Sequence, residues 1–194
     1  MRVAEIINTQ KKTPFSCILE QCNQFLVDTR TQPLLKNLPI QYNNIHKVKV
    51  RKRNVNNEFA ELFNQAFDEQ FNSITQRAIF ANGLSSFVED KNGTTEPFFI
   101  FPIDGYKYLY SSEVNNSSQD YKQVIDTMFE QFGSDKGKNI VSDLLKFTYK
   151  HDNLCEGIEK GCEIVLYDVP YYFAVRSKYV SNSYDLLLQD ILQN

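Results

Sequence analysis

The sequence predicts a mixed α/β (α+β) fold, in which a mainly antiparallel sheet system is flanked by helices. The chain has 194 residues, of which 42% are hydrophobic, so it is long enough to bury one ordinary core. Some segments repeat apolar residues at helical spacing, and others are short apolar runs bounded by turn residues. Because the two kinds of segment are mixed along the chain and no linker composition divides it, we expect a single domain over residues 1–194.

The predicted helices are amphipathic segments whose apolar residues fall on one face. They cover residues 14–26, 59–71, 121–132, 140–147 and 184–192. Thr13-Pro14 is typical of a helix start, because threonine accepts a bond from a free N–H and proline fits the first helical position. We therefore expect an N-terminal helical segment within about residues 1–30, and Ser183 is expected to cap the last helix.

The predicted strands are short apolar or alternating runs between turn signals. They cover residues 33–39, 46–50, 98–101, 106–110, 163–167 and 171–175, and a further short apolar segment is Ala78-Ile79-Phe80. The turn residues Pro102-Ile103-Asp104-Gly105 predict a hairpin between residues 98–101 and 106–110. Asp168-Val169-Pro170 predicts a second strand pair near the C-terminus, and Asn82-Gly83 predicts a turn.

Charge and hydropathy restrict the possible partners. The net charge is -3, with 21 basic and 24 acidic residues, so the molecule as a whole is not expected to bind nucleic acid or a membrane surface. No run approaches a membrane span, and the start at Met1 lacks the pattern of a signal peptide, so we expect a soluble protein that is not secreted. One local basic run, residues 47–53, is interpreted either as a phosphate-facing patch or as a solvated edge strand.

The cysteines and histidines do not form a familiar site. Cys17, Cys22, Cys155 and Cys162 contain no CxxC pair and have no histidine at zinc spacing, so we expect no metal and four reduced thiols. The chain also lacks the GxxxxGK[ST], GxGxxG, HExxH and GxSxG motifs, which disfavours the corresponding enzyme classes.

Glu163 and Arg77 are the charged residues with the clearest positions. Glu163 opens a buried strand, where a carboxylate is held rigidly while it faces a cleft; the alternative is a strand-end glutamate in water. Arg77 precedes a short apolar segment, and it either contacts a ligand or pairs with a surface carboxylate.

Four segments, taken in order, carry a family resemblance. They are Pro33-Leu34-Leu35-Lys36, residues 76–83, residues 99–103 and Gly161-Cys162-Glu163-Ile164-Val165. In these segments the chain resembles a group of tailed-phage proteins that are similar to the mono-ADP-ribosyltransferases of the phage Mod and Alt type. The resemblance implies an ADP-ribosyltransferase-like fold and NAD as a substrate.

The resemblance also implies roles for individual residues. Glu163 would be the catalytic glutamate, which binds the nicotinamide ribose and stabilises the positive charge that develops as the glycosidic bond breaks. Lys36 would stand at the NAD-contacting position of the first strand, with Arg77 as a second candidate cation. Ser85 or Ser86 would supply the serine of the central motif.

The sequence departs from that family pattern in three places. Lys36 replaces an arginine or histidine and lacks the planar fork that binds a pyrophosphate. No S-T-S triplet is present, and Gly161 stands where arginine-modifying members carry a second glutamate. Two functions are therefore predicted: a transferase that modifies a host macromolecule, or an inactive domain of the same fold that serves in the virion or binds a host protein. Either would act in the host cytoplasm or in the virion.

Overall fold

The computed structural model describes residues 14–30, 32–51, 58–71, 77–88, 90–113, 126–127, 130–131 and 134–193. Its strands are β1 (Leu34–Pro39), β2 (Ile45–Lys49), β3 (Ile79–Gly83), β4 (Thr95–Pro102), β5 (Lys107–Tyr110), β6 (Glu163–Tyr167) and β7 (Tyr171–Arg176). Its longer helices are α1 (Pro14–Gln21), α2 (Asn23–Asp28), α3 (Glu58–Phe71), α5 (Ser134–Thr148), α6 (Leu154–Glu159) and α7 (Tyr184–Leu192), and a 3-10 turn, η2, covers Ser177–Val180. The predicted mixture of helices and strands is confirmed.

The cap of the last helix follows from the sequence as expected, whereas the N-terminal helix is interrupted. The Ser183 side chain caps α7 by accepting a hydrogen bond from the Leu186 backbone N–H. The predicted N-terminal helix is divided at Cys22 into α1 and α2. Of the helix predicted at residues 121–132, only residues 126–127 and 130–131 are described, and these four are helical.

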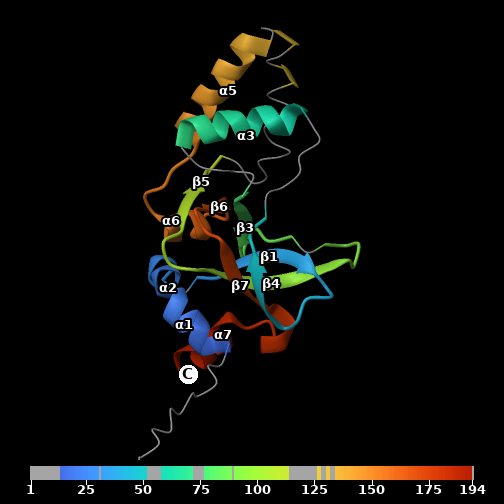
Figure 1. Ribbon diagram of the computed structural model, residues 1–194, viewed down its shortest axis with the longest axis vertical. Helices are drawn as coiled ribbons and strands as arrows, with labels where there is room; N and C mark the ends of the chain where they lie inside the picture. Colours follow the sequence, from blue (N-terminus) through green and yellow to red (C-terminus); the bar gives the residue numbers. More distant parts are fainter. Residues whose placement is uncertain are drawn as a thin grey trace, which may run out of the picture.

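The strands form one seven-stranded sheet in the order β2-β7-β4-β1-β3-β6-β5, and every neighbouring pair is antiparallel. Figure 1 shows the sheet between two groups of helices, with α1, α2 and α7 at one end and α3 and α5 at the other. The larger core joins the first group to the sheet through buried residues such as Ile18, Phe25 and Leu187. The smaller core packs Phe67 of α3 and Leu145 of α5 against Val165 of β6.

The predicted hairpin between β4 and β5 is wrong. β4 lies between β7 and β1, whereas β5 is an edge strand that pairs with β6. The turn residues bond to α1 and α2 instead of closing a hairpin: the Asp104 carboxylate accepts from the Gln24 N–H, and the Gly105 N–H donates to the Gln24 side chain. These bonds direct the chain away from β4, so β5 reaches the opposite edge of the sheet.

The predicted strand pair of β6 and β7 is also wrong, because three strands lie between them in the sheet. Only Asp168, Val169 and Pro170 connect the two strands. An extended chain advances at most about 3.6 Å per residue, so this link spans at most about 14 Å. Four strand spacings in a flat sheet would measure about 19 Å. The two halves of the sheet must therefore bend toward each other where this link crosses.

The bend coincides with an incomplete pairing inside the sheet. β1 pairs with β4 at five positions, but it pairs with β3 only at Leu34 and Leu35. Beyond these residues the ammonium group of Lys36 crosses to β3 and donates to the Phe80 carbonyl oxygen at 2.8 Å. The sheet consequently opens between β1 and β3, and a lysine side chain joins the two sides.

Acid is expected to destabilise the contact between β4, β7 and the chain that follows β1. Lys178 and Arg176 both bind the Glu96 carboxylate, and these hydrogen bonds lower the pKa of Glu96 below its ordinary value of 4.5. Because the folded-state pKa is lowered, the contribution to stability is full above pH 4.5 and is lost as the pH falls through the lower, folded-state value. Urea unfolding from pH 6 to pH 3 should show a smaller acid-dependent loss in Glu96→Gln than in the wild type. An equal loss in the two proteins would contradict this assignment.

Cys17, Cys22, Cys155 and Cys162 are all free thiols in the structure, and burial raises the pKa of Cys22, Cys155 and Cys162. These three thiols are therefore neutral at pH 7, which makes them poor nucleophiles. Among the described helices, none is long and apolar enough to cross a membrane.

Candidate functional site

Glu163 lies at the first position of β6, where α6 and a tight turn hold the strand in place. The Asn153 side chain caps α6 by accepting from the Glu156 N–H, and the buried face of this helix includes Leu154 and Ile158. The turn that follows closes with a bond from the Cys162 N–H to the Gly157 carbonyl oxygen. Glu163 is half-buried and stands opposite Asn82 of β3. Because cross-strand partners point to the same face of a sheet, the carboxylate and the Asn82 side chain share one face.

The two candidate serines lie beside the start of β6. Ser85 and Ser86 belong to the turn that follows β3, and the Ser86 hydroxyl lies 3.4 Å from the Gly83 carbonyl oxygen, to which it donates. A Cβ atom at Gly161 would lie 3.2 Å from the Ser86 Cβ and 3.3 Å from the Ser85 Oγ. The serine turn therefore packs directly against the turn that leads into Glu163.

The same contact explains why residue 161 is a glycine. Gly161 has a φ of +70°, in the left-handed region that side chains rarely adopt, and the two serines occupy the space beside it. A glutamate at this position would be strained and crowded. The departure from the arginine-modifying pattern is thus built into the local backbone.

Lys36 lies on β1, next to the residue that pairs with Asn82. Leu35 is opposite Asn82, which is in turn opposite Glu163, so Lys36 and Glu163 lie on strands separated only by β3. The bond from Lys36 to the Phe80 carbonyl oxygen keeps the ammonium group at β3. Lys36, the serine turn and Glu163 thus all lie next to β3, but the Lys36 side chain leaves β1 on the opposite face from Leu35, Asn82 and Glu163, because successive side chains of a strand alternate.

Arg77 lies elsewhere. It precedes β3, and β3 pairs with β6 through Ile79 and Leu166. Continuing this register by two residues brings Arg77 level with Asp168, at the opposite end of β6 from Glu163. The structure therefore does not bring Arg77 together with Glu163 and the serines.

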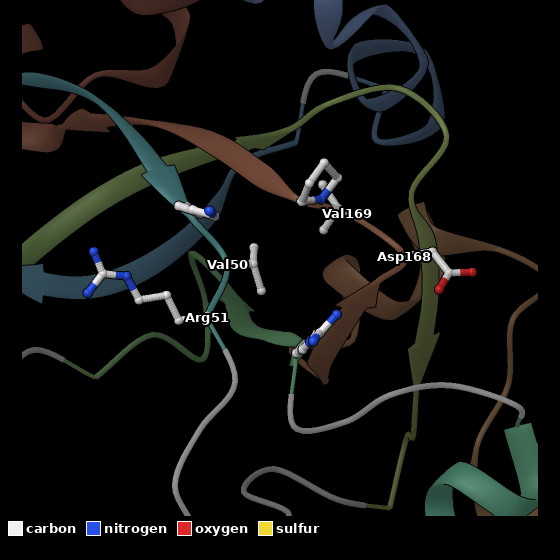
Figure 2. A pocket seen from close by; sticks show the side chains of 7 residues that line it. Val50, Arg51, Asp168 and Val169 are labelled. Atoms are coloured by element: carbon white, nitrogen blue, oxygen red, sulfur yellow. The ribbon is translucent and has the colours of Figure 1, made fainter.

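Arg77 instead lines a cavity of about 570 Å³ at the link between β6 and β7. The other lining residues are Lys49, Val50, Arg51, Asp168, Val169 and Pro170. Figure 2 shows Val50 and Arg51 on one side of this cavity, and Asp168 and Val169 on the other. Two cations of the basic run at residues 47–53, Lys49 and Arg51, are therefore joined at this cavity by a third, Arg77, which precedes β3.

Asn82 is the residue near Glu163 that the sequence interpretation missed. Asn82-Gly83 was interpreted as a turn, but these residues form the last two positions of β3. Gly83 is required there because a Cβ atom would lie 2.8 Å from the Ile158 carbonyl oxygen of α6. The Asn-Gly pair is thus explained by close packing under α6, and it brings an amide side chain opposite Glu163.

No group of three or more histidine, cysteine or carboxylate side chains suited to a metal ion occurs among the residues that the structure describes. Comparisons of the chain with known protein families, with curated proteins and with solved structures found no match.

Proposed function

We propose that the protein is a mono-ADP-ribosyltransferase-like enzyme that uses NAD to modify a macromolecule of a bacterial host, as its resemblance to tailed-phage proteins implies. The observation that carries the proposal is the arrangement of the residues implicated by that resemblance. Lys36, the Ser85-Ser86 turn and Glu163 are far apart in the sequence, yet they belong to β1, to the end of β3 and to β6, which are adjacent strands. Lys36 and Glu163 leave the sheet on opposite faces, so one dinucleotide would meet both by passing through the opening between β1 and β3.

Each residue has a chemical role in this proposal. The Lys36 ammonium group binds the pyrophosphate, and a serine hydroxyl of the turn positions the nicotinamide end of NAD. The Glu163 carboxylate accepts a hydrogen bond from the ribose 2′-hydroxyl and stabilises the positive charge on the ribose. The bond between ribose and nicotinamide breaks, and its electron pair leaves with the nicotinamide nitrogen. The acceptor then forms a bond to the same ribose carbon and loses its proton.

A second candidate is an inactive domain of the same fold that binds a host or virion protein. The contact that favours it is the bond from Lys36 to the Phe80 carbonyl oxygen, because an ammonium group used to join β1 and β3 is less available to a ligand.

If the protein is an active transferase, the structure also restricts the type of residue that it modifies. With Gly161 in a left-handed conformation, we do not expect arginine to be the modified residue.

Calorimetry with NAD separates the two candidates. We expect the wild type to bind NAD at submillimolar to millimolar concentration, and Lys36→Gln to weaken binding by about tenfold through loss of a charge-assisted bond. Lys91→Gln, which removes the same charge from an exposed turn, is the matched control and should leave binding unchanged. Label from NAD should also pass to a protein in a bacterial lysate. If the wild type binds no NAD at millimolar concentration, the inactive-domain alternative replaces the enzyme.

A further inference from the structure

The cavity at the link between β6 and β7 is formed by the bend of the sheet. The Val50 N–H, directly after β2, donates to the Pro170 carbonyl oxygen at 2.9 Å, which fastens the β2 side to the link. On the other side, Arg77 leads into β3 at the level of Asp168. Asp168 has a φ of +58°, so the chain turns sharply where β6 ends. Residues from β2, β3 and the link therefore meet around one concave space.

The charge of this cavity is strongly positive. Lys49, Arg51 and Arg77 line it, and among the described residues none of these three forms an ion pair. The one carboxylate in the lining, Asp168, is neutralised by Lys107, whose ammonium group lies 2.7 Å away. In Figure 2 the Asp168 carboxylate points away from Val50 and Val169. The Arg51 guanidinium also points away from Val50 and Val169 in this view, so it stands at the rim of the cavity. No unpaired carboxylate among the lining residues opposes the three cations.

The remaining lining is apolar. Val50, Val169 and Pro170 present hydrocarbon, and Val169 is itself buried. The volume of about 570 Å³ is in the range of pockets that hold a small organic molecule. Arginine is suited to phosphate because its planar guanidinium donates two parallel hydrogen bonds to a pair of oxygens. An apolar wall beside two arginines and a lysine therefore matches a ligand with an organic part and more than one phosphate group.

We propose that this cavity is a second binding site, which takes a small organic diphosphate such as a nucleoside diphosphate. The phosphate groups bind Lys49, Arg51 and Arg77, and the organic part lies on Val50, Val169 and Pro170. The site is separate from the candidate catalytic site, because Asp168 and Glu163 are at opposite ends of β6. A nucleic-acid backbone is less well matched, because the cations line a cavity with an apolar wall and the molecule as a whole is acidic.

Calorimetry with ADP, inorganic pyrophosphate and adenosine tests the proposal on the full chain. We expect ADP to bind more tightly than either of the other two probes, since only ADP meets both parts of the cavity. Arg51→Gln and Arg77→Gln should each weaken ADP binding by about tenfold or more, as expected for loss of a charged hydrogen bond. Lys91→Gln should change it less than twofold, and circular dichroism should show that all variants are folded.

The controls distinguish this site from the one around Glu163. ADP also carries the diphosphate that Lys36 would bind in NAD, so Lys36→Gln should affect only that site and should leave the ADP binding that Arg77→Gln weakens. If Lys36→Gln removes all ADP binding while Arg77→Gln removes none, the ligand lies at β1 and β3 and the proposal is overturned. Absence of ADP binding at about 5 mM would also overturn it. Equal affinity for pyrophosphate and ADP would overturn the role of the apolar wall. Tight binding of a single-stranded oligonucleotide with no ADP binding would overturn the small-molecule assignment.

Discussion

Replacing Glu163 by glutamine is expected to reduce the rate of NAD cleavage by about 10²–10³-fold and to change NAD affinity little. Glutamine has the same size and still accepts a hydrogen bond from a ribose hydroxyl, so the ground-state complex is largely kept. It lacks the negative charge that stabilises the cationic ribose of the transition state, and this interaction exists only during bond cleavage. The release of nicotinamide under saturating NAD measures the rate, and calorimetry measures the affinity.

Glu113→Gln is the matched control, because it removes one carboxylate charge from an exposed position after β5. Its cleavage rate should equal that of the wild type. If Glu163→Gln lowers NAD affinity and rate equally, or lowers the melting temperature by several degrees, Glu163 supports the fold and does not act in the transition state. A wild type that binds NAD but cleaves none would leave only the binding function.

Replacing Gly157 by alanine is expected to destabilise the protein by about 2–3 kcal/mol, as in other overpacked cores. The added Cβ would lie 2.7 Å from Cγ, 2.9 Å from Cδ2 and 3.0 Å from Cδ1 of Tyr110. The ring has no room to retreat, since Tyr110 is 1% exposed and its hydroxyl donates to Asp152 at 3.0 Å. Its backbone also exchanges two hydrogen bonds with Lys150. The melting temperature should fall by about 5–10 °C.

A double-mutant cycle isolates the steric cause. In a Tyr110→Leu background the ring is absent, and the added methyl group should then cost little or stabilise α6 by up to about 1 kcal/mol, because alanine favours helix. Gly93→Ala provides a second comparison, since a Cβ there would meet nothing within 4 Å and only its φ of +68° is unfavourable. If Gly157→Ala costs the same with and without the Tyr110 ring, the clash is not the cause.

Local patterns in the sequence predicted most of the helices and strands but not the partners of the strands. The alternation at residues 46–50 and the apolar runs at 98–101 and 163–167 each became a strand, because these patterns reflect which side chains are buried. The turn at Pro102–Gly105 predicted a hairpin, because its residue types are those of a hairpin turn. Its actual bonds run to Gln24, which is distant in sequence, so no local signal could reveal them.

The candidate sites were predictable to different degrees. Glu163, the serines and Lys36 were chosen by resemblance, and the structure places all of them next to β3, with Lys36 on the opposite face from Glu163. Arg77 was chosen for the same site, but it lies with Arg51 at another cavity. The sequence could not show that both arginines line one cavity, because the cavity depends on a bend imposed by a link of three residues. Asn82 was missed because an Asn-Gly pair at a strand end resembles a turn.

The strand order has a consequence for how the chain acquires its structure. None of the six described strand pairs joins strands that are linked by a simple turn; β2, for example, pairs with β7, and β3 pairs with β6. Chains dominated by contacts between distant residues close large loops before any pairing rewards them, so they fold slowly. Among the described strands β2 pairs only with β7, so it has no partner until the end of the chain leaves the ribosome. β1, β3 and β4 can pair with one another earlier, but the outer edges of β3 and β4 wait for β6 and β7. During synthesis the early strands therefore carry unpaired edges, which is the period in which aggregation competes with folding.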